Sequence, residues 1–503
     1  MKTLNVFLNL LLLICCTALS SSLYAQWTQM GGDIDGSTAY DNLGWSVSLS
    51  SDGHTLAIGA PSGNGQIEGY VRVFEWNGNA WNQKGTDLIG EAIDDGFGRS
   101  VSLSSDGNTL AIGAPYNDGN GNSSGHVRIF TWNGTGWIQK GNDIDGEAST
   151  DFSGDAVSIS ADGNTVLIGA PGNNGNGPNS GHVRVFQWNG TDWTQKGNDI
   201  DGEAQDDLSG DAVSISADGN TIAIGAPHND GSNTNAGHVR VYQWNGTNWV
   251  QKGNDIDGVG NFTSDRSGQS VSLSSDGNTV AIGAPGYDGV NGYNSGHVRV
   301  FHWNGTSWIQ KGSSIDGEAT NDYSGISVSL SSDGNTVAIG AHYNDGSGSN
   351  AGHVRIYEWN GSAWVQKGGD LDGEAPGDWL GWAVSLNAGG DIVAAGAPHN
   401  GQNGTDAGHV RVYAFSSLNI PDNDLEADIK ISPNPNTGNF SIFLSNKLES
   451  VSITIVDLTG KKVFQNVFKD VSKIDLELDL PKGVYVILLK SGDMNKLVKL
   501  LIQ

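Results

Sequence analysis

The stretch from Ser100 to Gly141 decides the fold: it is SVSLSSDGNTLAIGAPYNDGNGNSSGHVRIFTWNGTGWIQKG. It contains four short runs of β-forming residues, separated by turn residues. Asp106-Gly107 joins the first two runs and Asn133-Gly134 joins the last two, and both dipeptides are typical of tight β-hairpins. A longer polar segment connects the second run to the third. The stretch therefore predicts a four-stranded antiparallel meander (strands A, B, C and D).

This unit is repeated along the chain. Its Asp-Gly turn recurs every 54 to 58 residues, at Asp52, Asp106, Asp162, Asp218, Asp276 and Asp333, with a weaker seventh copy near Gly390. A fixed period of this length is typical of β-propellers, in which each four-stranded sheet covers the face of the next. We predict an all-β fold with seven blades over residues 26–415.

The two ends of the repeated region complement one another. The seventh unit stops after strand C at Phe415, whereas the chain offers an isolated strand D at Trp27 to Gly36. We expect this N-terminal strand to close the last blade, because closure removes two open sheet edges.

Charge and the N-terminus bear on location and partners. The net charge is -29, and the Lys and Arg residues are scattered by the repeat, so nucleic acid is not expected as a partner. Residues 1–25 have Lys2, an apolar run and small residues at the end, as a signal peptide does. The run, about 13 residues long, is shorter than the roughly 20 that a membrane helix needs, so no transmembrane segment is expected after cleavage. Both cysteines lie in this segment, which leaves no disulfide or thiol chemistry.

The units resemble FG-GAP repeats, the blades of the integrin α-subunit propeller. The resemblance rests on Phe97-Gly98 before strand A, Gly113-Ala114-Pro115 after strand B and a Gly-x-Val-Arg-Val strand C, and it covers about 26–415. It implies the propeller fold. Calcium-binding blades of that family carry an Asp-rich loop between strands A and B, and this chain has a tight Asp-Gly hairpin there.

Residues 416–427 form a polar linker, and residues 428–503 resemble the type A C-terminal sorting domain of the type IX secretion system. The resemblance rests on Ser432-Pro-Asn-Pro435, Asp457-Leu-Thr-Gly460, Lys482-Gly-Val-Tyr485 and a Lys-Leu-rich end. It implies a small Ig-like β-sandwich, contact with the type IX machinery, and a place outside a Gram-negative cell or on its outer-membrane surface.

One slot in each unit differs from blade to blade. It follows the Gly that starts strand A and should ring the mouth of the central channel; it holds Trp45, Arg99, Asp155, Asp211, Gln269, Ile326 and Trp382. Closure brings Trp45 and Trp382 together, with Trp379 nearby. We predict a ligand site at Trp45, Arg99, Asp155, Asp211, Trp379 and Trp382, since aromatic platforms suit sugar rings. The alternative is that these side chains plug the channel.

The loops from strand D to the next strand A carry repeated carboxylates. Asp143, Asp145, Glu147 and Asp151 lie in one loop, and Asp199, Asp201, Glu203 and Asp207 lie in the next. Oxygen ligands of this kind suit Ca²⁺, so each loop is a candidate cation site. The alternative is that these carboxylates cap turns. Calcium is the one cofactor that the sequence suggests.

The sequence favours a secreted or surface-exposed, non-catalytic binding or adhesion protein, whose long-loop face takes a polysaccharide or an extracellular protein. A polysaccharide-acting lyase or glycosidase on the same scaffold is the first alternative, and a structural surface or matrix component is the second. No nucleophile-base arrangement stands apart from the repeated residues.

Overall fold

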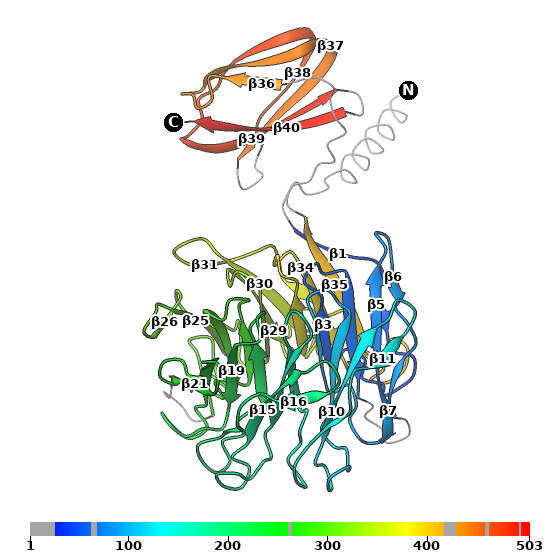
Figure 1. Cartoon of the computed structure of the whole chain (residues 1–503). Coiled ribbons are helices and arrows are strands. Elements are labelled where there is room, and N and C mark those ends of the chain that lie inside the picture. The colour runs from blue at the N-terminus through cyan, green and yellow to red at the C-terminus, as the bar shows by residue number, and fades with distance from the viewer. Residues whose placement is uncertain are drawn as a thin grey trace. The chain divides into compact units, whose positions relative to one another are not determined.

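The computed structural model describes residues 26–61, 68–259, 264–416, 429–457, 462–491 and 494–502. The predicted signal peptide at 1–25 lies outside these residues, and so does nearly all of the predicted linker at 416–427. Two compact units are present, of which one spans Trp27–Phe415 and the other contains the C-terminal residues from Ser416. In the described residues every regular element is a strand (Figure 1).

The larger unit is the predicted seven-bladed propeller. Each blade is a sheet whose strands follow the order A-B-C-D. Strand A is β3 (Ser46–Leu49), β8 (Ser100–Leu103), β13 (Ala156–Ile159), β18 (Ala212–Ile215), β23 (Ser270–Leu273), β28 (Ser327–Leu330) and β33 (Ala383–Leu386). Strand B is β4 (Thr55–Ala60), β9 (Thr109–Ala114), β14 (Thr165–Ala170), β19 (Thr221–Ala226), β24 (Thr279–Ala284), β29 (Thr336–Ala341) and β34 (Ile392–Ala397).

Strands C and D form the outer half of each blade. Strand C is β5 (Glu68–Trp76), β10 (His126–Trp132), β15 (His182–Trp188), β20 (His238–Trp244), β25 (His297–Trp303), β30 (His353–Trp359) and β35 (His409–Ser416). Strand D is β6 (Trp81–Gln83), β11 (Trp137–Gln139), β16 (Trp193–Gln195), β21 (Trp249–Gln251), β26 (Trp308–Gln310), β31 (Trp364–Gln366) and, in the last blade, β1 (Gln26–Gln29).

A fifth short strand, which the sequence analysis did not predict, follows each strand D. After the Lys-Gly break, where Gly141 has φ +82°, the chain pairs again with strand C. These strands are β7 (Leu88–Ile93), β12 (Ile144–Asp145), β17 (Ile200–Asp201), β22 (Ile256–Asp257), β27 (Ile315–Asp316), β32 (Leu371–Asp372) and β2 (Ile34–Asp35). Each one carries the chain toward the next blade.

Closure of the ring by the N-terminus is confirmed. Strands β1 and β2 join the sheet of β33, β34 and β35. Trp27 is buried, its ring lies 5.2 Å from that of Phe415, and its indole N–H donates to the carbonyl of Lys367 at 2.6 Å. In the other blades the Trp pair of the C-D hairpin makes the equivalent ring contact, with ring centroids 5.4 to 5.5 Å apart.

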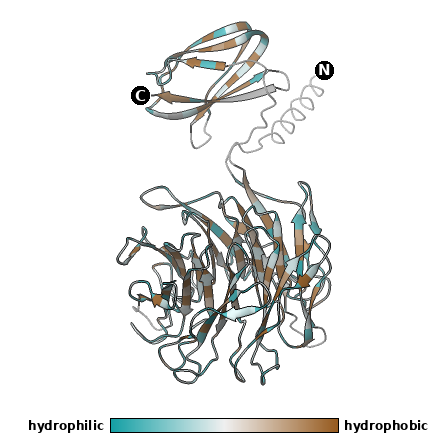
Figure 2. Cartoon of the chain, viewed as in Figure 1, coloured by the Kyte–Doolittle hydropathy of each residue, from teal (hydrophilic) through white to brown (hydrophobic). Residues whose placement is uncertain are grey.

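The core lies between the blades. Strand B is completely buried in six of the seven blades, and apolar residues concentrate on the inner strands (Figure 2). Burial on both sheet faces explains why strand B is a continuous apolar run rather than an alternating one.

Two closed circles of hydrogen bonds line the channel near the A-B turns. In the first, a backbone N–H of each blade donates to a carbonyl of the next at 2.9 to 3.0 Å, through Ser51, Ser105, Ala161, Ala217, Ser275, Ser332, Ala388 and back to Ser51. In the second, a strand A serine accepts from the next blade's backbone, as Ser102 Oγ does from the N–H of Ile159 at 3.0 Å. Each circle gives one backbone N–H of every blade a partner in a neighbouring blade.

The smaller unit is a β domain whose strands are β36 (Ile429–Ser432), β37 (Asn439–Asp457), β38 (Lys462–Glu477), β39 (Gly483–Ser491) and β40 (Met494–Ile502). Its hydrogen-bonded order is β36-β37-β39-β40, with β38 also paired to β37. The pairing of β37 with β38 contains a register shift between Phe443 and Leu448.

Candidate functional site

The variable slot lies where it was predicted, at the channel mouth opposite the A-B turns. All seven of its residues line one cavity of about 240 Å³. Strand A reaches this mouth through a Gly with positive φ, such as Gly44 at +94°, where an added Cβ would meet the backbone of His409. The slot residues lie in the turn that directly precedes the first residue of strand A.

One side of the mouth is aromatic. The rings of Trp45 and Trp382 lie 4.8 Å apart, and Trp379 stacks on Trp382 at 5.7 Å. The ring of His399 lies 4.0 Å from that of Trp379. The three Trp side chains are partly exposed. Blades six, seven and one thus present a contiguous aromatic surface of the kind that stacks on flat, weakly polar ligands.

Trp379 adopts the left-handed backbone conformation, with φ +61°. The backbone is left-handed at this position, three residues before the variable slot, in every blade, and the other residues there are Asn42, Gly96, Phe152, Leu208, Arg266 and Tyr323. Glycine is the residue that this conformation favours, and a bulky side chain there costs of order 1 kcal/mol. The Trp379 side chain is therefore present despite a local conformational cost.

The opposite side of the mouth is polar. The Arg99 side chain donates to Asp155 at 3.2 Å and lies over the ring of Trp45 at 4.9 Å. Gln269 donates to Asp211 at 2.6 Å. Burial, and then the neighbouring Asp155 carboxylate, raise the pKa of Asp211 above its ordinary value. The mouth therefore joins aromatic rings to hydrogen-bonding groups.

His342 belongs to the aromatic side, and sequence reasoning missed it. Its ring lies 5.2 Å from that of Trp382 and 5.4 Å from that of Trp379. The side chain is 3 % exposed, and burial lowers its pKa to about 3, so the imidazole is neutral. The signal was its place in the repeat: Gly-Ala-His stands in blade six where the other six blades have Gly-Ala-Pro.

A pocket in blade seven continues this surface. It has a volume of about 560 Å³, and its wall includes His399, Gln402 and Asp406. His399 Nδ1 lies 2.9 Å from the Asp406 carboxylate, which fixes the ring that contacts Trp379. The channel mouth and this pocket thus share the Trp379 region as a common border.

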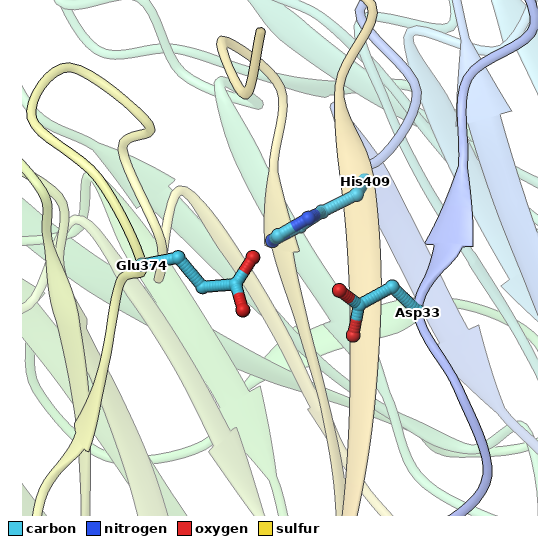
Figure 3. Close-up of side chains that lie close together, drawn as sticks. All are labelled: Asp33, Glu374 and His409. Carbon is cyan, nitrogen blue, oxygen red and sulfur yellow. The ribbon is translucent and has the colours of Figure 1, made fainter. Parts of the chain in front are cut away.

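The carboxylates of each D-to-A loop do not converge on one point. Asp143 and Glu147 belong to two different clusters, each built around a strand C histidine. These triads are Glu91, His126 and Asp143; Glu147, His182 and Asp199; Glu203, His238 and Asp255; Glu318, His353 and Asp370; and Glu374, His409 and Asp33 (Figure 3 shows the last). Within each triad the candidate ligand atoms lie within 4.8 Å of one another.

The remaining carboxylates of the two predicted loops have structural partners. Asp151 and Asp207 are buried, and each accepts a hydrogen bond from an Asn in its own blade, Asn173 or Asn229. Asp145 and Asp201 contribute backbone carbonyls, which accept from Arg184 and Arg240. The loop carboxylates therefore divide between blade stability and the triads.

Comparison with known families agrees with this architecture. A model described as "FG-GAP repeat" matches residues 90–130, 143–186 and 314–357, and one described as "Secretion system C-terminal sorting domain" matches residues 430–503. The chain carries FG-GAP repeats. No curated protein matches it.

Solved structures similar to this chain share little sequence with it. They include a putative 6-phosphogluconolactonase from Bacteroides uniformis (10 % identity, TM-score 0.46, 66 % of this chain, 86 % of that one) and a periplasmic gluconolactonase from Pseudomonas aeruginosa (14 %, 0.45, 66 %, 85 %). The β-propeller domain of the Trilobed protease from Pyrococcus furiosus is a third (12 %, 0.42, 77 %, 98 %). These values carry no argument about activity.

The sorting domain determines where the protein is exported. It directs the chain through type IX secretion to the cell surface or the extracellular space of a Gram-negative bacterium. No helix of the described residues is long and apolar enough to span a membrane. Any ligand of the channel mouth is therefore met outside the cell.

Proposed function

We propose that this protein is a non-catalytic binding protein of the cell surface or the extracellular space, and that the channel mouth binds a polysaccharide. The contiguous aromatic surface of Trp45, Trp379 and Trp382 carries the proposal. Sugar rings stack on indole faces, and their hydroxyls pair with groups such as those on the polar side of the mouth.

The charge of the chain restricts the class of polysaccharide. With a net charge of -29, the protein repels acidic chains at low salt. The mouth itself balances Arg99 against Asp155, so it offers no net positive charge to an acidic sugar. A neutral polysaccharide fits these two observations.

The test is co-sedimentation of the purified protein with insoluble neutral polysaccharides. Trp379→Gly introduces the residue that blade two has at the equivalent left-handed position. Trp382→Gln introduces the residue that blade five has in the variable slot. Each change is expected to weaken binding by about 2 kcal/mol, roughly thirtyfold in Kd. Phe152→Gly is the matched control, because it removes an aromatic side chain from the same left-handed position in blade three, outside the aromatic surface. Equal binding by all variants would refute the polysaccharide site and favour a protein partner or a matrix role.

A polysaccharide-cleaving enzyme is the second candidate, and the pair Asp155 and Asp211 favours it. A carboxyl group with a raised pKa beside an ionised one is the arrangement that glycosidases use. New reducing ends in the same assay, absent in Asp211→Asn, would establish cleavage. Retention of the protein without new ends supports binding alone.

A further inference from the structure

We infer that the five Glu-His-Asp triads are sites for a divalent transition-metal ion of the Zn²⁺ class. Each triad combines an imidazole with two carboxylates, and imidazole is a ligand that zinc accepts readily whereas calcium prefers six to eight oxygens. The calcium expected from the loops alone is therefore replaced by a different ion and a different ligand set.

The triad of the closing blade shows the geometry most clearly. The His409 ring points between the carboxylates of Glu374 and Asp33, which reach it from two other segments of the chain (Figure 3). His409 is 0 % exposed, and neither ring nitrogen has a hydrogen-bond partner among the described residues.

In three triads a carboxylate uses one oxygen for a protein partner and turns the other toward the histidine. Glu318 Oε1 lies 3.2 Å from the Arg355 guanidinium, while Oε2 lies 3.8 Å from Nδ1 of His353. Asp143 Oδ1 accepts from Gln139 at 2.6 Å, while Oδ2 lies 3.9 Å from Nδ1 of His126. Such partners orient ligands around metals.

These separations are close to those of a loaded site. Ligand atoms around a tetrahedral zinc lie about 3.3 Å apart, given bonds of about 2.0 Å. The observed 3.8 and 3.9 Å to the nearer carboxylate, and up to 4.8 Å for the other pairs of donors, therefore need the donors to move together by about 0.5 to 1.5 Å. Water supplies the remaining ligands, since each Glu is partly exposed.

The two blades without a triad each lack two of its three members. Blade five has Val259 and Ser314 in place of Glu and Asp, and keeps only His297. Blade one has Ser37 and Tyr70 in place of Glu and His, and keeps only Asp87. The arginine of strand C is present in all seven blades, so the carboxylates are not there simply to neutralise it.

The experiment measures zinc bound per chain after removal of metal and dialysis against micromolar Zn²⁺. We expect five ions per wild-type chain. Asp33→Ser/Glu374→Val, which copies blade five into blade seven, is expected to bind four. Asp87→Ser is the matched control, because it removes the equivalent carboxylate from a blade with no triad and should leave five.

The Tm measured with and without zinc provides a second test, which the wild-type protein alone can fail. Zinc is expected to raise the Tm of the wild-type protein, and less so that of Asp33→Ser/Glu374→Val. Calcium at the same concentration should have a smaller effect. Absence of bound zinc, or equal stoichiometry in the wild type and the double variant, would overturn the inference and leave the triads as ion-pair networks with arginine.

Discussion

The two ends of strand A face the same channel but differ in their residues. At the A-B turns every blade lines the channel with a Leu or Ile and with a Ser or Ala, and the hydrogen bonds repeat around the whole circle. At the other mouth the seven slots hold Trp, Arg, Asp, Gln and Ile. In a repeat protein, a residue that every unit keeps is needed to build the unit, so variation at one ring of positions shows where the fold leaves freedom for binding.

The largest expected loss of stability follows from a change in the strand that closes the last blade. Trp27→Ala removes a buried ring and the indole hydrogen bond that close the last blade, and it should lower the free energy of unfolding by about 3–5 kcal/mol. Urea denaturation followed by fluorescence measures it. Thr28→Ala, one residue along on an exposed position, serves as control; equal effects of the two would mean that the seam contributes little.

A smaller loss should follow from breaking one hydrogen bond of the serine circle. Ser102→Ala leaves the N–H of Ile159 without its acceptor, at a cost of about 1 kcal/mol. Ser105→Ala should change nothing, because Ser105 joins its circle through the backbone and three blades have Ala there. If both variants lost the same stability, the side-chain circle would not be the cause.

The polar side of the variable mouth predicts a pH effect. The folded-state pKa of Asp211 is raised, so the folded protein holds a proton that the unfolded chain releases once the pH exceeds about 3.8. Stability should fall as the pH rises from there to the folded-state pKa. Asp211→Asn should remove this fall and raise the Tm at pH 8. Parallel Tm curves from pH 4 to 8 for variant and wild type would contradict the shift.

The smallest effect on stability is expected at the aromatic side. Trp45→Gln should change the free energy of unfolding by less than about 1 kcal/mol, because Trp45 is partly exposed and blade five folds with Gln269 in this slot. The same denaturation assay measures it. A loss comparable with that of Trp27→Ala would make Trp45 a structural plug, and the difference between the two channel ends would then disappear.

The period of the Asp-Gly turns was enough to predict the seven blades, the N-terminal closure and the place of the variable slot. The approach of Trp45 to Trp382 followed, because closure makes blades one and seven neighbours. The triads were missed because each joins a Glu of one D-to-A loop to a His and an Asp of the following blade, whereas the sequence analysis grouped the carboxylates loop by loop. The fifth short strand was missed because two residues carry no periodicity.

The closing blade also has a consequence for timing. Trp27 is among the first propeller residues to be synthesised, yet its partner Lys367 comes 340 residues later. At about 5–20 residues per second, a ribosome needs from under twenty seconds to more than a minute to cover that distance. Throughout that interval the first strand has no edge to pair with, and each newly folded blade exposes one uncovered face. The ring can be closed only when the residues just before the secretion tail have been made. Closure of the propeller is therefore a single late event.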